Sequence, residues 1–298
     1  MAHTNVLGLI SSICFVITIL FDRLDRAKSS RILHDQYSHL NDLVSILIAS
    51  TGIITSIVQL KPPYDSGFAS RWNFNFDLEK ILELPNQIFH AYLPIPINGL
   101  NFWETNLLKE NTLLTIAASI FLSVVILLSI SYFVHRRTAF VLYISMTMGL
   151  LIFFYVKYSG GIRHHGYLYI ALLAALWISP SCGQPSSIKT LLENKSYATM
   201  DINIVLSRCL TTLFTIQSMG GIIACINDYK YPFSSAKETA KYIKRKNLVN
   251  SLIIGHKSPS ASAVSGYINR KSIYYLDASR NGTFIRWDDK RKRYNTEH

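Results

Sequence analysis

The chain has 298 residues, of which 49% are hydrophobic and only 16% are charged. A soluble domain usually carries about 25% charged residues. Here the charges are nearly absent from several long runs and dense elsewhere. This pattern argues against a soluble protein and predicts an integral membrane protein. The net charge of +12 is concentrated after residue 226, which favours an anionic membrane surface or ligand. No nucleic-acid motif accompanies it.

We expect an α-helical membrane bundle of about six spans in residues 1–226, followed by a small α/β domain in residues 227–298. The fifth predicted span is short for a bilayer. The second is interrupted by Ser and Thr, which predicts that it faces other helices rather than lipid. The predicted spans are 6–21, 43–60, 112–134, 138–156, 167–178 and 204–226.

A long polar and aromatic loop, residues 61–111, separates the second span from the third. Within it, residues 76–93 mix charges with apolar residues at helical spacing, which predicts a helix in the membrane interface. Aromatic side chains around it suit the belt at the headgroup level, namely Trp72, Phe74, Phe76, Phe102 and Trp103.

The last 72 or so residues read as alternating helices and strands. Helices are expected over 234–246 and 258–267, and strands over 248–254, 272–276 and 283–287. Asn281-Gly282 is the expected turn between the last two strands. The basic run 290–293 is expected to be a solvated tail.

Charge in the short loops predicts the orientation. The two most basic short loops, 22–31 and 135–137, fall on one side, which the positive-inside rule makes cytoplasmic. With six spans, the long loop, the segment 163–166 and the C-terminal domain lie outside a bacterial inner membrane. If the short fifth span does not cross, the C-terminal domain is cytoplasmic.

The main candidate site is Arg163-His164-His165, at a predicted membrane boundary. Arginine and histidine suit a phosphate or a developing anion, and histidine exchanges protons near neutral pH. The alternative is a cluster that contacts lipid headgroups. Two adjacent histidines without a third ligand are weak support for a metal. The sequence shows no cofactor motif and leaves a divalent metal open.

Other polar residues each have a functional and a structural interpretation. Asp65, Asp77 and Glu79 on the long loop are weak candidates for a general base or metal ligand, against ordinary exposed carboxylates. His256, Lys257 and Ser258 at a helix start suit an anion, against plain turn chemistry. In the last span, Arg208 is expected to extend to the headgroups and Gln217 to bond a neighbouring helix.

Several short stretches together carry a resemblance to a known family. Residues 163–169, 175–178 and 231–244, with Gln217, Gly220 and Asp228, resemble the C-terminal half of polytopic bacterial proteins. Those proteins are similar to the C-type membrane glycosyltransferases. The resemblance implies transfer of a sugar from a polyprenyl-phosphate carrier at the outer membrane face, and a small α/β domain after the last span.

One feature of that superfamily has no counterpart in this chain. Its usual catalytic carboxylate lies in the first outside loop, and here no Asp or Glu lies outside before Lys61. No catalytic residue is therefore carried over. We expect either a truncated glycosyltransferase-like protein, whose missing spans an N-terminal partner chain would supply, or a non-catalytic membrane protein with a C-terminal binding domain. A transporter is less well supported, because no inverted repeat is visible.

Overall fold

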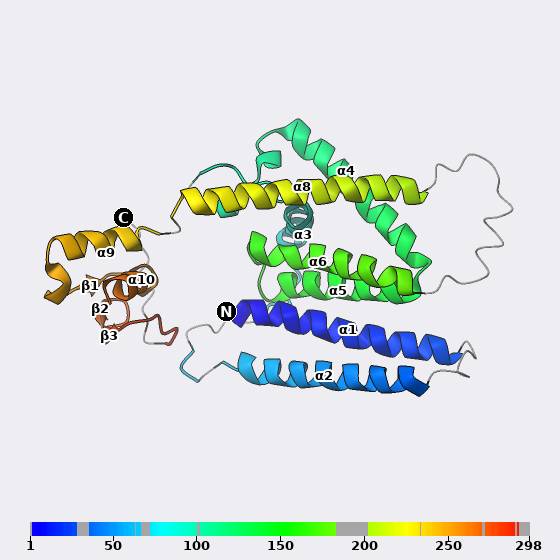
Figure 1. The fold of residues 1–298 in the computed structure, drawn as a ribbon, viewed down its shortest axis with the longest axis horizontal. Coiled ribbons are helices and arrows are strands. Elements are labelled where there is room, and N and C mark those ends of the chain that lie inside the picture. Colours follow the sequence, from blue (N-terminus) through cyan, green and yellow to red (C-terminus); the bar gives the residue numbers. More distant parts are fainter. Residues whose placement is uncertain are drawn as a thin grey trace. The chain divides into compact units, whose positions relative to one another are not determined.

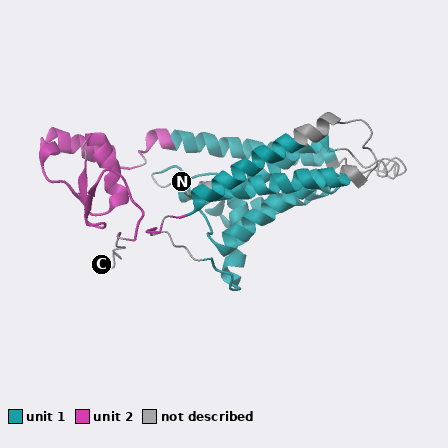
Figure 2. Cartoon of the chain, turned by 90° about the horizontal axis from the view of Figure 1, so that it is seen from below, with its two compact units in different colours: residues 1–61, 72–227 teal, residues 62–71, 228–298 magenta. Residues whose placement is uncertain are grey.

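The computed structural model describes residues 2–28, 36–62, 64–66, 72–99, 102–182, 202–232, 234–269, 272–289 and 291. The predicted basic positions Arg31, Lys290, Lys292 and Arg293 lie outside them. The chain divides into two compact units (Figure 2): residues 1–61 with 72–227, and residues 62–71 with 228–298. We call them the helical unit and the C-terminal unit. The second unit thus includes a short piece of the long loop.

Five helices of the helical unit are long and apolar enough to cross a membrane. They correspond to the predicted spans other than the fifth. Capping side chains satisfy backbone groups at the helix ends. At the start of α4, for example, the Asn111 side chain accepts hydrogen bonds from the Leu113 and Leu114 N–H groups. The helices are α1 (Ala2–Lys28), α2 (Gln36–Leu60), α4 (Thr112–Val134), α5 (Arg137–Val156) and α8 (Ile202–Lys230).

A sixth helix, α6 (Ile162–Ile178), occupies the position of the weak fifth span. It begins before the predicted start at residue 167, so the prediction of a loop through 166 was wrong. Its 17 residues rise about 25 Å, close to the thickness of the hydrocarbon core. It packs along α5 (Figure 1) and leads into a short 3-10 turn, η4 (Ser179–Ser181).

Helix α2 corrects another expectation. From residue 43 onward, most of its side chains are exposed instead of facing other helices. In the described part of the chain, its main packing partner is α1. The hydroxyl groups of Thr51 and Thr55 need no neighbouring helix, because they bond within α2 itself. Thr51 Oγ1 donates to the Leu47 carbonyl at 2.8 Å and Thr55 Oγ1 to the Thr51 carbonyl at 2.9 Å.

Helix α3 (Leu78–Tyr92) lies within the predicted interfacial helix. Figure 1 shows it end-on, crosswise to α5 and α6. Its C-terminal residues Phe89, Ala91 and Tyr92 are buried in the bundle core, and the Tyr92 and Tyr143 hydroxyls are 3.1 Å apart. Helix α3 therefore enters the bundle from the side. The chain then continues through η2 (Phe102–Glu104) and η3 (Leu107–Lys109).

The C-terminal unit is a three-stranded sheet with two helices. Strand β1 (Ile254–Gly255) pairs in parallel with β2 (Ile273–Tyr275), which pairs antiparallel with β3 (Arg280–Gly282). Helix α10 (Ser258–Ile268) connects the parallel strands, and α9 (Ala236–Arg245) packs on α10. Both helices match the predicted ones. The predicted strand 248–254 was largely wrong: residues 248–250 form a 3-10 turn, η5 (Leu248–Asn250), and only Ile254 lies in β1.

The predicted last strand, 283–287, and the predicted turn before it were wrong, because the final strand is formed by residues 280–282. Asn281 and Gly282 belong to β3, and the turn is Leu276–Ser279, with Ser279 at φ 47°. Gly282 leaves room for the Tyr275 ring, because a Cβ there would lie 3.0 Å from that ring and the ring would have to shift. Close approach of a neighbouring side chain is a common reason for glycine in a strand.

Candidate functional site

The C-terminal end of α3 is where several elements of the helical unit meet. The last carbonyls of a helix have no partner within it and must be satisfied from outside. Here the Gln217 side chain on α8 donates to the Ala91 and Tyr92 carbonyls, each at 2.9 Å. Asn106 donates to the Leu93 carbonyl at 2.7 Å. These bonds tie α8 and the segment after α3 to the same point.

Gly220 on α8 adds a close backbone contact to this junction. A Cβ at Gly220 would lie 2.1 Å from the Pro94 carbonyl oxygen, whereas a Cβ at Gly221 would meet nothing within 4 Å. The interpretation of Gln217 as a residue that bonds a neighbouring helix is therefore confirmed. Arg208 is exposed near the opposite end of α8.

A pocket of about 190 Å³ opens at this junction. Its wall is mostly apolar, and the polar side chains in it are those of Thr105 and Gln217. A cavity of this size and character suits an apolar segment of a ligand rather than a polar molecule. Its lining residues are Pro94, Pro96, Phe102, Trp103, Thr105, Ile162, Gln217, Gly220, Gly221 and Ala224.

Lys109, His90 and His165 form a polar cluster in the same unit. Lys109 Nζ lies 2.8 Å from His90 Nε2 and also bonds the Asn86 side chain. The rings of His90 and His165 have their centroids 6.3 Å apart. The cluster and pocket share elements: Ile162 and His165 are one turn apart on α6, and Thr105 and Lys109 lie on the same segment.

Each of the two histidines has one ring nitrogen without a hydrogen-bond partner among the described residues: a donor in His90 and an acceptor in His165. His90 Nε2 accepts from the Lys109 ammonium, so in neutral His90 the proton is on Nδ1. His165 Nε2 lies 2.8 Å from the Ser159 carbonyl and must donate to it, which leaves Nδ1 as an acceptor. Both Nδ1 atoms are buried and have no hydrogen-bond partner in the described part of the chain, as is also true of Gln87 Oε1. Buried polar atoms of this kind normally bind a water or ligand.

The charge of the cluster is carried by Lys109. Burial, with smaller contributions from Lys109 and His165, lowers the pKa of His90 to about 4, so His90 is neutral at physiological pH. Burial also lowers the pKa of Lys109. Among the described residues Lys109 forms no salt bridge with a carboxylate. Because Lys109 is exposed, its ammonium is open to an anion from solution or from a lipid headgroup.

The three residues of the main predicted site have different surroundings. Arg163 is exposed, beside the pocket residue Ile162. His164 is buried and accepts the Gly161 N–H through Nδ1 at 3.0 Å, so it caps the start of α6. Of the three, His165 alone belongs to the cluster with His90 and Lys109, where it is the most deeply buried member. Sequence reasoning missed His90 and Lys109, because nothing in their spacing links them to His165.

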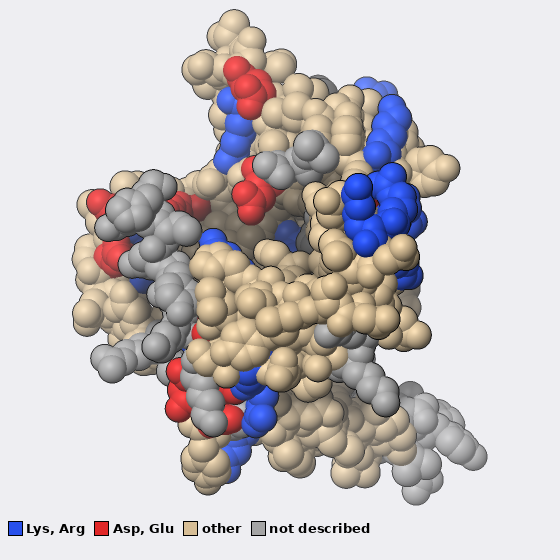
Figure 3. All heavy atoms as spheres, turned by 90° about the vertical axis from the view of Figure 1, so that its left-hand side faces the viewer, with Lys and Arg blue, Asp and Glu red and all other residues tan. Residues whose placement is uncertain are grey.

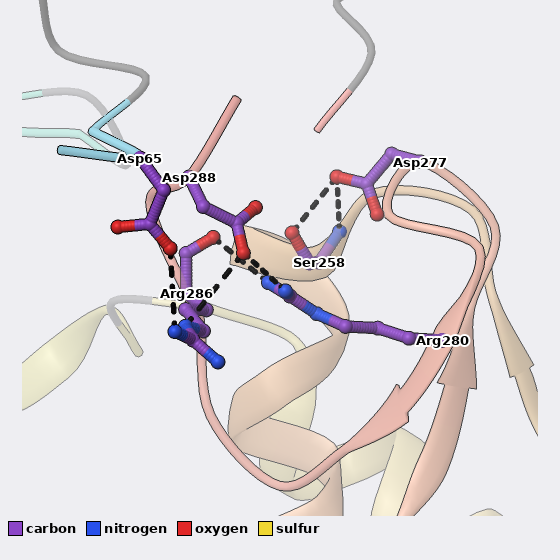
Figure 4. Close-up of polar contacts among 6 residues, drawn as sticks. All are labelled: Asp65, Ser258, Asp277, Arg280, Arg286 and Asp288. Atoms are coloured by element: carbon purple, nitrogen blue, oxygen red, sulfur yellow. Dashed lines mark hydrogen bonds and ion pairs between the residues drawn. The ribbon is translucent and has the colours of Figure 1, made fainter. Parts of the chain in front are cut away.

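The predicted carboxylates do not join this cluster. Asp77 caps α3 by accepting the Lys80 N–H at 3.3 Å. Glu79 is exposed in the first turn of α3. Asp65 belongs to the C-terminal unit and pairs with Arg286 at 3.3 Å (Figure 4). Across the described residues, no group of three or more His, Cys, Asp or Glu is placed to hold a metal ion.

The predicted anion site at the start of α10 is filled by the chain itself. Ser258 donates to Asp277 Oδ2 through its backbone N–H at 3.1 Å and its hydroxyl at 2.8 Å (Figure 4). Arg291 Nε, 3.1 Å from the same oxygen, completes the arrangement. Arg291 is therefore not part of a solvated tail. His256 and Lys257 are exposed beside this cap, so Ser258 is not open to an external anion.

Comparison with known proteins adds no family. No protein-family model matches the chain, and no curated protein or solved structure is significantly similar to it. The class of protein is therefore inferred from the fold alone. Five membrane-length apolar helices and a small three-stranded sheet fit a multi-pass membrane protein with a small α/β unit.

Proposed function

We propose that this chain is a glycosyltransferase-like membrane protein that binds a phosphate-bearing polyprenyl lipid at the junction of α3, α6 and α8. The observation that carries the proposal is Lys109, an exposed cation that contacts His90 and forms no salt bridge among the described residues, on a segment that also lines an apolar pocket. A polyprenyl phosphate combines an apolar chain with an anionic head, so each half has a complementary group. The sequence resemblance suggests that the lipid carries a sugar.

The location of the junction supports an outer-face site. It lies at the end of the bundle where α5 finishes and α6 begins, and the basic turn between α4 and α5 lies at the other end (Figure 1). Short basic loops stay in the cytoplasm, so the junction would face outward. Arg163, exposed next to Ile162, would add a second cation for the phosphate.

Binding without transfer is the second candidate, and one observation favours it. Sugar transfer to a hydroxyl needs a general base, usually a carboxylate or histidine. Among the described residues no carboxylate forms a salt bridge with Lys109, and His90, with a pKa of about 4, is a weak base. A protein that holds or presents the lipid would need no base at all.

Lipid binding to the full chain in nanodiscs separates phosphate recognition from pocket filling. The probes are a polyprenyl phosphate and the polyprenol of the same length, followed by tryptophan fluorescence. Lys109→Gln should weaken phosphate-lipid binding by about tenfold or more, the value of one charge-assisted hydrogen bond, and leave polyprenol binding unchanged. Lys80→Gln is the matched control, because Lys80 makes only a long ion pair with Asp77.

Equal affinity for the phosphate and the alcohol would contradict the proposal. Transfer itself is tested in the host, by comparing its glycans in cells that carry the wild type, Lys109→Gln or Arg163→Ala. Altered glycans in the variants would support transfer. Unchanged glycans together with weakened lipid binding would favour the non-catalytic alternative.

A further inference from the structure

Helix α9 of the C-terminal unit carries a stripe of basic side chains. Lys237, Lys241, Lys244 and Arg245 are spaced by four, seven and eight residues from the first, which places them along one side of a helix. All four are exposed. The apolar side of α9 is buried in the core of the C-terminal unit, through Ala236, Ala240 and Ile243. The stripe is therefore fixed toward solvent.

Little negative charge within the unit is available to neutralise the stripe. The buried carboxylates are paired with arginines elsewhere in the fold: Asp288 with Arg280 and Arg286 (Figure 4), and Asp277 with Arg291. On α9 itself only Glu238 forms an ion pair, with Lys241 at 2.7 Å. Figure 3 shows Lys and Arg side chains gathered on part of the face that it draws, apart from most of the Asp and Glu. The stripe therefore favours binding of an external anion.

The chain keeps α9 close to the membrane helix α8. Helix α8 ends at Lys230 and α9 begins at Ala236. The residues between them can span at most about 18 Å when fully extended. Helix α8 is itself long enough to cross both the hydrocarbon core and the headgroup layers. An anionic bilayer surface is thus the nearest extended array of negative charge that the connection allows.

We propose that the basic stripe of α9 binds the anionic phospholipid headgroups of the bilayer that α8 crosses. The attraction is electrostatic, because the apolar side of α9 is already used in the core of the unit and cannot enter the lipid. Binding should therefore require anionic lipid and weaken as salt is added. It does not depend on lipid-phosphate recognition at the Lys109 cluster.

Hydrogen exchange of the full chain in nanodiscs tests this surface. Peptides covering residues 236–246 should exchange roughly tenfold more slowly in nanodiscs that contain phosphatidylglycerol than in phosphatidylcholine alone. High salt should remove the difference. Replacing Lys237, Lys241 and Lys244 by Gln and Arg245 by Gln should also remove it, whereas the matched set with the three lysines changed to Arg should retain it.

If the Gln variant folds poorly, hydrogen exchange of the wild-type chain in the two lipids still tests the proposal. Peptides covering α10 and β2 report on that folding, because they should exchange alike in every case. Equal exchange of α9 in both lipids would overturn the proposal. A difference that survives the Gln substitutions, or slowing by soluble polyphosphate but not by lipid, would overturn it as well.

Discussion

At the scale of single residues, His90 shows how partial burial changes the chemistry of a side chain. Its ordinary pKa of 6.5 falls to about 4 in the fold, mainly through burial and also through Lys109 and His165. Between these two values the unfolded chain binds more protons than the folded one. Stability is therefore fully present above about pH 6.5 and is lost as the pH falls toward 4.

This linkage predicts an acid-sensitive helical unit. The thermal midpoint of the purified full chain should fall by several degrees between about pH 7.5 and pH 4.5, and His90→Gln should reduce that fall. Lys109→Gln should reduce it less, because burial remains. The measurement is a thermal scan in detergent at each pH. An identical pH dependence in wild type and His90→Gln would show that His90 is not the sensor.

The site residues mark the limit of what the sequence could predict. Arg163 and His165 drew attention because polar residues at a membrane boundary are costly. His90 and Lys109 carry no such signal, since both lie in a loop where charges are ordinary. Only the packing of α3 on α6 brings His90 to His165. His164 was misread for the same reason, because its role as the cap of α6 depends on Gly161 and not on a ligand.

At the scale of elements, the contact of α8 with the segment after α3 holds the junction together. Gly220 permits it, because any Cβ would strike the Pro94 carbonyl, which is backbone and cannot rotate away. Small residues commonly allow such close approach between membrane segments. The apolar pocket depends on the same contact, since Pro94 and Gly220 both line it.

Adjacent glycines give this contact a matched test. Gly220→Ala should force α8 away from Pro94 and lower the thermal stability, by about 1–3 kcal/mol as is usual for overpacking. Gly221→Ala should be neutral or slightly stabilising, because alanine favours a helix over glycine and nothing obstructs it. Thermal unfolding of both variants is the measurement. Equal effects at the two positions would mean that the contact is not formed.

Element prediction succeeded where a single rule dominates and failed where tertiary packing decides. Charge-free runs predicted the five membrane-length helices because burial of charge in lipid is so unfavourable. The start of α6 was missed because its first turn contains Arg163 and two histidines, which packing buries in part. Asn281-Gly282 failed as a turn because Tyr275 packs against Gly282 within the sheet. The Ser and Thr residues of α2 predicted that it faces other helices. This failed because the Thr51 and Thr55 hydroxyls bond within α2, so the helix can be exposed.

At the scale of the whole molecule, α6 decides the topology. If α6 crosses together with the five longer helices, both the long loop and the C-terminal unit lie opposite the basic turn 135–137. If it does not cross, the C-terminal unit lies on the side of that turn. The length of α6 is at the lower limit for a span, and its packing along α5 favours crossing.

Reporter fusions decide between these topologies. Alkaline phosphatase fused after residue 298 should be active, and the same enzyme fused after residue 137 should be inactive, if six helices cross. A cytoplasmic fluorescent reporter at each position should give the reverse pattern. An inactive phosphatase with a bright fluorescent reporter at the C-terminus would place that unit in the cytoplasm and remove α6 from the set of spans.

The junction of α3, α6 and α8 is proposed to bind a phosphate-bearing lipid. A polyprenyl phosphate that carries a photoreactive group in its first isoprene unit, cross-linked to the full chain in nanodiscs, tests this most directly. We expect cross-linked peptides from residues 94–105 and 217–224, lost on competition with unlabelled polyprenyl phosphate and reduced in Lys109→Gln. Cross-links confined to the exposed faces of α2 and α4, unaffected by competitor or variant, would contradict it.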